Sequence, residues 1–562
     1  MSALASVLRI ERTPLIARSL LLAAALLLTL FLLLPLGTVL LHAFADDEAG
    51  LSLRRFGEFF ASPGVGQSIR TTLWIGLLVT FITVPLAFAY AYALQRACLP
   101  GKALWRTLGL APLLGPSLVG AIAFIQWFGT QGLLKSWLMG HSVYGPIGIV
   151  MATVFAAFPH AFMIFSVALG TADARLYEAA DSMGASRWRK FMTITLPGAK
   201  YGLISAAMVV FAYAISDFGI PKVIGGNTPV LAVDIYVQVV GLQHFGRGAV
   251  VALVLLLPVL LAFAIDTHLQ RRQQASLTAR AVPYVPRPHR GRDSLLLAYC
   301  ALLGLVMLGV LGMAAYTSLV RFWPYDLSVS LDHYTFGLAE AGVLDAYLNS
   351  LKMALLTALT GTPLIFLTAW LLEKTQAGGR RLQGWIQAMA ALPMGVPGLV
   401  LGIGYILCFN HPGNPLNGLY HTLAIMIAAN VVHYYTACHL TALTALKTLD
   451  REFEAVSASL KVSPFVTLWR VTLPVCLPAV LEIARYLFIN AMTTVSAVVF
   501  LYAPHTLPAS VSILNLDEAG ELGPAAAMAT LIVLTTALTS LAYSLITHLL
   551  FKRHQAWRNG QR

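Results

Sequence analysis

Glu-Ala-Ala-Asp-Ser-Met-Gly-Ala-Ser, residues 178–186, is followed by a Leu-Pro pair at 196–197. About half the chain later a related stretch, Glu-Ala-Val-Ser-Ala-Ser-Leu-Lys-Val-Ser-Pro, occupies residues 454–464 and is followed by Leu-Pro at 473–474. Each copy is a polar, charged island between long apolar segments. A membrane protein that keeps two such islands is expected to hold them against a soluble partner.

The composition indicates a polytopic membrane protein. Of 562 residues, 58% are hydrophobic and 11% are charged, whereas a soluble domain carries about 25% charged residues. The mean hydropathy is +0.76. The net charge of +13 is attributed to Lys and Arg in cytoplasmic loops. Without a basic stripe interleaved with aromatic residues, no nucleic-acid partner is predicted. The five cysteines are scattered without a CxxC motif, so we expect neither a disulfide nor a metal site.

About twelve segments are long and apolar enough to cross a membrane, since a spanning helix needs about 20 mainly apolar residues. We therefore predict an all-α polytopic membrane protein. The first six spans are expected near 18–44, 67–95, 104–130, 146–170, 199–219 and 244–269. The second six are expected near 294–320, 345–372, 384–409, 418–446, 476–500 and 524–551.

The placement of Lys and Arg predicts the orientation. Basic clusters fall in alternate loops, including 175–200, 271–292 and 447–470, whereas the loop 500–523 holds three acidic residues and no Lys or Arg. Basic loops stay on the cytoplasmic side. We therefore expect both termini and both islands to face the cytoplasm, and lipid to surround the spans.

The two sets of spans form a parallel repeat. Besides the islands, Ala-Pro-Leu-Leu-Gly-Pro at 111–116 resembles Leu-Pro-Met-Gly-Val-Pro at 392–397. We predict a first half at 1–270, a basic, proline-rich linker at 271–293 and a second half at 294–562. Because both halves start on the same side, their pseudo-twofold axis would follow the membrane normal, with one translocation path between them.

Each island is predicted to form a helix, a sharp turn and a second helix. In the first, Asp173 and Ser186 are suited to cap the two helices, and Gly184 suits the left-handed position between them. In the second, Ser463 followed by Pro464 is a good start for a helix. A short helix on a stiff elbow can fit into a cleft of a neighbouring protein and transmit a push. An ordinary amphipathic loop is the alternative for either island taken alone, but the recurrence argues against it.

The first island resembles the EAA signature of permease subunits of ATP-binding-cassette importers. The residues that fit it are Glu178, Ala179, Ala180, Gly184, Leu196 and Pro197. The second island is divergent, because Lys461 replaces the glycine and residues 455–457 stand in place of Glu-Ala-Ala. The resemblance implies that ATPase coupling rests on Glu178, Ala179, Ala180, Gly184, Pro197, Glu454, Ala455, Lys461, Pro464 and Pro474. The divergence predicts that the two coupling contacts are not equivalent.

The resemblance also implies the partners and the fold type, that of type I importer permeases. Two ATPase subunits would bind from the cytoplasm, and a periplasmic binding protein would deliver the solute to a permease in the bacterial inner membrane. The chain has no phosphate loop of its own, because residues 129–136 lack the required Gly-Lys pair. We therefore expect no enzyme activity and no bound cofactor here, with ATP and Mg²⁺ used by the partner subunits.

Two halves fused in one chain resemble the ferric-iron and phosphonate branch of these importers. Residues 452–461, 490–500 and 216–222 look most like the permease for 2-aminoethylphosphonate, and the last stretch resembles ferric-iron permeases almost as well. The prediction is a 2-aminoethylphosphonate importer, with ferric iron or another small anion as the alternative. An ion-driven secondary transporter is a further rival. A membrane enzyme is not supported, because the sequence contains no convincing set of catalytic residues.

Polar residues inside spans are candidates for the translocation path, because their insertion is costly. We predict that Ser216 and Asp217 in the first half, and Asn490 and Thr494 in the second, line it. Hydrogen bonding between helices is the alternative role. Glu482 and Arg485 are expected to pair with each other. His433 and His439, six residues apart, do not share a helical face, so no metal site is predicted.

Overall fold

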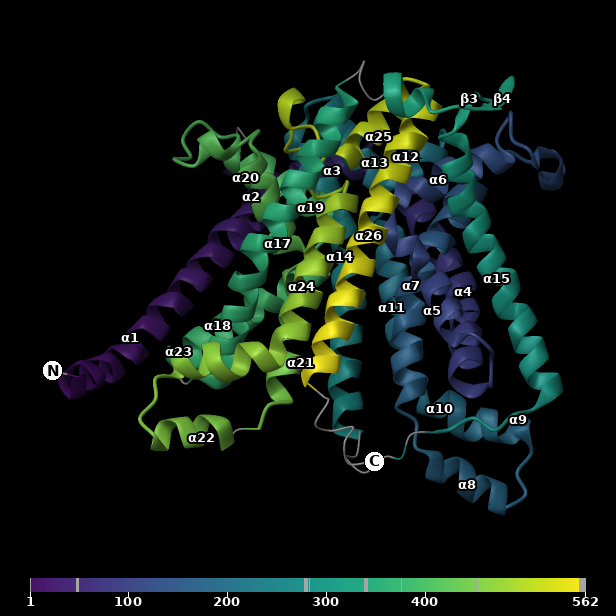
Figure 1. Ribbon diagram of the computed structural model, residues 1–562. Helices are drawn as coiled ribbons and strands as arrows, with labels where there is room; N and C mark the ends of the chain where they lie inside the picture. Colours follow the sequence, from purple (N-terminus) through teal and green to yellow (C-terminus); the bar gives the residue numbers. More distant parts are fainter. Residues whose placement is uncertain are drawn as a thin grey trace. The chain divides into compact units, whose positions relative to one another are not determined.

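The computed structural model describes residues 2–46, 50–276, 282, 284–337, 342–375, 377–450 and 452–554 (Figure 1). Almost all regular structure in these residues is helical. Two short hairpins are the exceptions. One joins β1 (Ala45–Asp46) to β2 (Gly50–Leu51), and the other pairs β3 (Val320–Phe322) antiparallel to β4 (Asp326–Val329), with Val320 opposite Val329. The predicted all-α fold class is confirmed.

The contacts divide the chain into two compact units that do not coincide with its two sequence halves. Unit 1 contains residues 1–45, 342–512 and 531–562, and unit 2 contains residues 46–341 and 513–530. The predicted division into 1–270 and 294–562 describes the repeat along the chain. Packing instead places the first helices of the chain with the second half, and the first long helix of the second half with the first half.

Unit 1 begins with α1 (Ser2–Leu28), η1 (Thr29–Leu33) and α2 (Leu34–Phe44). Its remaining elements are α17 (Val343–Lys374), α18 (Gly379–Ala391), η7 (Leu392–Gly395), α19 (Gly398–Phe409), η8 (Asn417–Leu419), α20 (Leu423–His433), α21 (Tyr435–Lys447), α22 (Glu452–Ser459), α23 (Pro464–Thr467), η9 (Leu468–Thr472), α24 (Leu473–Thr493) and η10 (Pro504–Thr506). Helices α25 (Ala509–Glu518) and α26 (Leu522–His554) contribute residues to both units.

Unit 2 contains the first elements of the repeat and the long helix α15 (Arg290–Thr317). Its other elements are α3 (Arg54–Ala61), α4 (Val65–Arg96), α5 (Lys102–Leu110), η2 (Ala111–Leu114), α6 (Ser117–Phe128), η3 (Lys135–Leu138), α7 (Pro146–Gly170), α8 (Ala174–Ser182), α9 (Arg187–Lys190), η4 (Phe191–Thr195), α10 (Leu196–Gly198), α11 (Lys200–Ser216), α12 (Gly219–Ile224), α13 (Leu231–Tyr236), η5 (Val237–Gly241), α14 (Phe245–Ser276) and η6 (His333–Gly337).

The number of spans agrees with the prediction of about twelve. Within the described residues, eight helices are long and apolar enough to cross a membrane, and four bent helix pairs raise the number to twelve if each pair is one span. Three of the bent pairs replace segments that the sequence predicts as continuous, near 104–130, 384–409 and 418–446. The fourth bend, between Gly198 and Lys200, lies at the start of the span predicted near 199–219.

Two of these bends repeat the same proline signal. The chain turns by 98° between η2 and α6, and by 114° between η7 and α19. Gly115 precedes Pro116 and Val396 precedes Pro397, and both preceding residues are extended. The proline ring disfavours helical backbone in the residue before it. The prediction of unbroken helices was therefore wrong at these two points.

Two other predicted boundaries also need correction. The span expected to reach residue 500 ends at Thr493, because Thr494 takes extended backbone. Helix α14 continues to Ser276 and α15 begins at Arg290, so helix enters both ends of the predicted linker at 271–293. The side chain of His289 accepts a hydrogen bond from the backbone N–H of Arg292 and caps α15.

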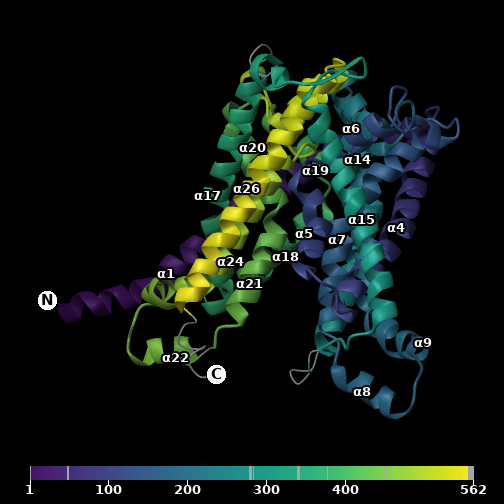
Figure 2. The same cartoon turned by 45° about the vertical axis from the view of Figure 1, so that its right-hand side comes forward.

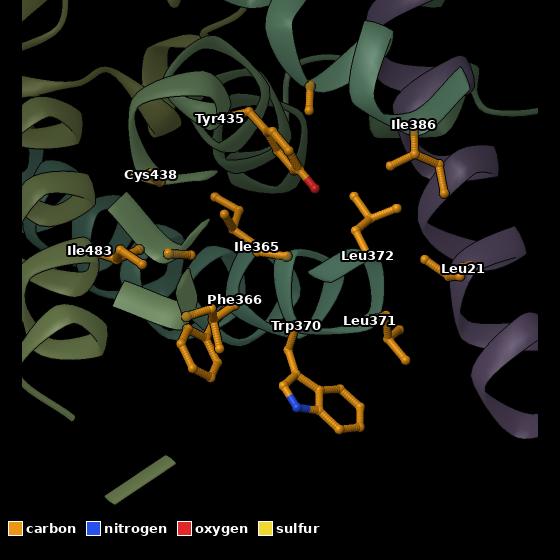
Figure 3. Close-up of a cluster of buried hydrophobic side chains, with 14 of the residues drawn as sticks. Leu21, Ile365, Phe366, Trp370, Leu371, Leu372, Ile386, Tyr435, Cys438 and Ile483 are labelled. Carbon is orange, nitrogen blue, oxygen red and sulfur yellow. The ribbon is translucent and has the colours of Figure 1, made fainter. Parts of the chain in front are cut away.

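The core of unit 1 joins distant parts of the sequence (Figure 3). Leu21 on α1 is fully buried and belongs to one hydrophobic cluster with Leu371 and Trp370 on α17 and Ile386 on α18. Tyr435 on α21 points into the same cluster. Because lipid is as apolar as these side chains, close packing rather than escape from water holds α1 here.

The core of unit 2 is formed where α4 packs against α7 and α11. Aromatic rings fill part of this contact, with Tyr90 edge-on to both Phe158 and Phe162. The Tyr90 hydroxyl donates a hydrogen bond to the carbonyl of Trp105, at 2.6 Å, so its polar end is satisfied. Because the Tyr90 side chain is buried and its hydroxyl binds the backbone of α5, it fixes α4 against α5. Helix α4 then ends beside the first island.

Candidate coupling elbows

The first elbow consists of α8, α9, η4 and α10, residues 173–198. Asp173 caps α8 by accepting a hydrogen bond from the backbone N–H of Arg175, at 3.1 Å. Ser186 caps α9 by accepting from the N–H of Arg189, at 3.2 Å. Gly184 has φ +66°. The predicted helix, left-handed turn and second helix are confirmed, and α8 lies beyond the ends of α7 and α15 in both views (Figures 1 and 2).

The second elbow consists of α22, α23 and η9, residues 452–472. Pro464 occupies the first turn of α23 after Ser463, as predicted, but the Ser463 side chain makes no capping hydrogen bond. Helix α22 lies beyond the end of α21 in both views (Figures 1 and 2). The two elbows correspond with a shift of 277 residues, since Leu196-Pro197 matches Leu473-Pro474.

The two turns have the same backbone despite their different residues. In the first, the N–H of Gly184 binds the Asp181 carbonyl at 3.0 Å, and that of Ala185 binds the Ala180 carbonyl at 2.9 Å. In the second elbow, the corresponding bonds join Lys461 to Ala458 at 3.0 Å and Val462 to Ser457 at 2.8 Å. Lys461 takes φ +55°. A lysine therefore occupies the left-handed position that usually takes glycine.

The elbows join their spans differently. In the first, the chain bends by 61° between Gly198 and Lys200, two residues after Pro197. In the second, residues 464–493 form one uninterrupted helical stretch through Pro474. Each elbow also contains a π-helical segment at the matching place, η4 at 191–195 and η9 at 468–472. Such segments often occur at functional sites.

Most of the predicted coupling residues are exposed. Glu178, Ala179, Gly184 and Pro197 are exposed on the first elbow, whereas Ala180 is buried. On the second elbow, the exposed predicted residues are Ala455, Lys461, Pro464 and Pro474. Glu454 is half-buried and forms an ion pair with Lys374, at 3.1 Å between Nζ and Oε1. Glu454 therefore holds the elbow to α17.

Both elbows carry an exposed apolar stripe that the sequence reasoning missed. On α8 and the turn after it, the stripe is Leu176, Ala179 and Met183, and on α22 and its turn it is Phe453, Val456 and Leu460. Met183 is 79% exposed and Leu460 is 70% exposed. These positions correspond between the elbows. The signal was present as apolar residues at positions i, i+3 and i+7 within otherwise polar islands.

Ionic contacts brace the first elbow internally. Lys190 on α9 forms an ion pair with Asp181 on α8. This hydrogen bond from Lys190 lowers the pKa of the Asp181 carboxyl. The matching positions of the second elbow are Ala458 and Thr467, so this contact has no ionic counterpart there. The Thr467 hydroxyl instead donates a hydrogen bond to the Ser457 hydroxyl, at 2.9 Å.

Two of the four predicted path residues lie in unit 2 and the other two lie in unit 1. Ser216 and Asp217 end α11 in unit 2, where the Asp217 carboxylate accepts from the Ile220 N–H, at 2.9 Å. Asn490 and Thr494 belong to unit 1, and the Asn490 amide donates to the Tyr486 carbonyl, at 2.8 Å. The hydroxyl of Ser216 donates to the Ala212 carbonyl, at 2.7 Å. The Ser216 and Asn490 side chains are thus bound within their own helices, and the role of all four residues in the path stays a prediction.

Two other predictions concerned polar groups in the spans: Glu482 and Arg485 were expected to form a pair, and His433 and His439 were expected not to form a metal site. Arg485 Nε binds Glu482 Oε2 at 3.0 Å, which confirms the predicted pair, and the guanidinium also lies over the Tyr543 ring at 5.1 Å. Among the described residues, no group of three or more His, Cys, Asp or Glu side chains could hold a metal ion.

Comparison with known proteins identifies relatives for most of the chain. A ferric transport system permease protein, FbpB, of Actinobacillus pleuropneumoniae is 26% identical over 523 residues, covering 89% of this chain and 74% of the relative. A putative ferric transport system permease protein, FbpB 1, of Haemophilus influenzae is 26% identical over 452 residues, covering 78% and 70%. The molybdenum transport system permease protein ModB of Escherichia coli is 30% identical over 167 residues, covering 29% and 73%.

The family match falls on both parts of the repeat. The family of binding-protein-dependent transport system inner membrane components matches residues 99–275 and 361–553, which together make up more than half of the chain. Each matched stretch includes one elbow. The chain is therefore a permease of an ATP-binding-cassette importer, with the permease unit present twice, and it belongs to the family of binding-protein-dependent transport system inner membrane components.

Proposed function

We propose that the two elbows each dock one ATPase subunit, and that this chain imports a small solute across the bacterial inner membrane. The observation that carries the proposal is the apolar stripe at matching positions of both elbows, 176, 179 and 183 in the first and 453, 456 and 460 in the second. Large exposed apolar side chains on otherwise polar elements mark interaction surfaces. Their recurrence fits two copies of one kind of partner.

The spacing of the stripe supports a helix-in-groove contact. Apolar anchors at i, i+3 and i+7 are the pattern by which a short helix enters an apolar groove. Burying a side chain such as Met183 or Leu460 contributes about 1.5–3 kcal/mol. Exposed Glu178 and Lys461 beside the stripes would set the orientation of each contact. Because the charges differ between the elbows, the two docking contacts would differ in strength.

In this proposal, both elbows and both termini face the cytoplasm, where the partner subunits use ATP and Mg²⁺. ATP binding would bring the two ATPase subunits together and move the elbows. The attached spans would then switch the path between inward-facing and outward-facing states, with each elbow as the coupling element. A periplasmic binding protein would deliver the solute on the opposite side, and Ser216, Asp217, Asn490 and Thr494 would line the path.

The proposed solute is 2-aminoethylphosphonate, with ferric iron as the alternative. Residues 452–461 and 490–500 support the phosphonate, by their resemblance to its permease. Relatives named ferric transport permeases, 26% identical to this chain, support ferric iron. The test is calorimetric titration of the purified periplasmic binding protein with each ligand. Tight binding of ferric iron without binding of the phosphonate would overturn the first choice and leave the importer permease unaffected.

The docking proposal is tested with Met183→Asp and Leu460→Asp in the full-length permease. Each places a charge at the end of one stripe, and we expect ATPase binding to weaken by at least about tenfold, since apolar anchors dominate such interfaces. Binding is measured with the purified ATPase subunit and the permease in nanodiscs. Met139→Asp is the matched control, because Met139 is also a highly exposed methionine and its position between η3 and α7 belongs to neither elbow.

Unchanged ATPase binding in both elbow variants would overturn the docking proposal. Uptake that persists in cells lacking the ATPase subunits would point instead to an ion-driven transporter. Loss of binding in the Met139→Asp control would indicate a nonspecific effect of surface charge, which would also count against the stripes.

A further inference from the structure

Arg96, the last residue of α4, is a buried cation without a carboxylate partner among the described residues. Its side chain belongs to a residue that is only 3% exposed. Nη2 donates to the carbonyl of Leu169 at the end of α7, at 3.1 Å. A buried charge is costly unless other groups compensate for it. The compensation therefore has to come from the groups packed around the guanidinium.

Two aromatic rings supply it, and they come from different parts of the chain. The guanidinium carbon lies 4.9 Å from the ring centre of Tyr177 and 4.4 Å from that of Tyr284. The two rings contact each other, with centres 4.7 Å apart. Tyr177 belongs to α8 of the first elbow, whereas Tyr284 belongs to the segment between the two sequence halves. Desolvated cation–π contacts of this kind reach about 2 kcal/mol or more.

The same segment also binds the start of α8 through its backbone. The N–H of Ala174 donates to the Val282 carbonyl at 2.9 Å, and the N–H of Val282 donates to Asp173 Oδ1 at 3.3 Å. The first N–H groups of a helix have no partner inside it, so Val282 satisfies one of them. Further along, the Cys98 thiol donates to the Pro286 carbonyl at 3.3 Å, which fixes the segment beside the end of α4.

The second elbow is held by the matching residue of the other half in a simpler way. Lys374 is the last residue of α17, which like α4 has 32 residues. Its ammonium bonds directly to Glu454, at 3.1 Å, and to the Leu449 carbonyl, at 3.1 Å. Glu454 occupies the position that corresponds to Tyr177. In each half, a basic residue at the end of a long helix therefore contacts the same position of the elbow. Among the described residues, a ring from the segment that joins the halves takes part only in the contact at the first elbow.

We infer that the segment formed by residues 282 and 284–289 is a working part of the first elbow, and that Arg96 and Tyr284 are positioning residues that hold α8 in place for its partner. The inference rests on the proposed docking role of the elbow. By this inference, the segment between the halves does more than connect them, because the geometry of the first coupling contact depends on that segment. The second elbow does not share this dependence.

The test compares Tyr284→Ala with Tyr284→Phe in the full-length permease in nanodiscs. Hydrogen–deuterium exchange is followed in peptides covering α8 and α22. We expect Tyr284→Ala to speed exchange in α8 by about tenfold, because local opening sets the exchange rate, and to leave α22 unchanged. Tyr284→Phe keeps the ring and should match the unmodified chain. Val285→Ala is the control for the segment itself, since Val285 is exposed beside Tyr284.

Unchanged exchange in α8, or equal acceleration in α8 and α22, would overturn the inference. A second readout is the number of ATP molecules hydrolysed per solute molecule transported, which should rise in Tyr284→Ala and return to normal in Tyr284→Phe. A normal ratio in Tyr284→Ala would also overturn the inference. If α8 loosens in Tyr284→Ala while Met183→Asp and Leu460→Asp both still bind the ATPase normally, the positioning stands and the docking proposal fails. If α8 is unchanged in Tyr284→Ala while Met183→Asp and Leu460→Asp lose ATPase binding, the docking proposal stands and the positioning inference fails.

Discussion

The first and second elbows reach the same turn by different means. Gly184 accepts a positive φ without a side-chain penalty, whereas Lys461 takes it at a cost of about 1–2 kcal/mol for a residue with a Cβ atom. The same pair of backbone hydrogen bonds closes both turns. The comparison teaches that the turn is imposed by the helices on either side of it, and that the glycine makes it easier to form without being required.

The elbows differ more in how they are attached than in their own shape. The first is separated from α11 by a 61° bend and is held by the contacts of Arg96 with the Tyr177 and Tyr284 rings. The second continues into α24 without a break in the helix and is held by the ion pair between Lys374 and Glu454. An unbroken helical connection carries displacement of the elbow into its span, whereas a break lets the elbow turn relative to its span. Displacement of each elbow would therefore reach its own span by a different route.

The largest effect is expected from Gly184→Val. A β-branched residue is a strong outlier at φ +66°, with a cost of about 1–3 kcal/mol, while the space around a new Cβ is open. The turn should reorganise without disturbing the core, and solute uptake by membrane vesicles should fall at least tenfold with normal membrane insertion. Lys461→Gly is the matched change in the other elbow, and there uptake should be retained. Normal uptake by Gly184→Val would contradict the elbow mechanism.

A smaller effect is expected from Lys374→Met, which keeps an unbranched side chain one atom shorter but removes its charge. The Lys374 side chain is 5% exposed, and removing the ammonium leaves the half-buried carboxylate of Glu454 unpaired, at a cost of about 1–3 kcal/mol. Hydrogen–deuterium exchange in α22 should rise about tenfold, while α8 should not change. Lys374→Arg retains the cation and serves as the control. Equal loosening of both elbows would show that their anchors are not independent.

The smallest effect is expected from pH, and only on the first elbow. The hydrogen bond from Lys190 lowers the pKa of Asp181 below its usual value, so the contact stabilises α8 at neutral pH. This stabilisation is lost as the pH falls through the lowered pKa, because the protonated carboxyl no longer attracts the ammonium. Exchange in α8, taken relative to Asp181→Asn at each pH, should converge with that variant below about pH 4. The second elbow, with Ala458 and Thr467 in these places, should show no such convergence.

Much of the fold could be predicted from the sequence because membrane spans follow from local composition. The number of spans, the repeat, and the caps at Asp173 and Ser186 are encoded within a few residues. The bends at Pro116 and Pro397 were also encoded locally, but the long apolar runs that surround them obscured the signal. The left-handed backbone at Lys461 was not predictable from its residue type, since glycine is the usual choice there.

The sequence by itself determined that this protein is a doubled, multi-pass permease with one elbow in each half, because hydrophobic length, proline and glycine act on their immediate neighbours. Only the tertiary structure decided that α1 packs with the second half, that Arg96 packs against the rings of both Tyr177 and Tyr284, and that Glu454 binds Lys374 instead of standing exposed. These contacts join residues from about 80 to more than 360 positions apart. They depend on close packing and on the compensation of buried charge, which no short stretch of sequence specifies.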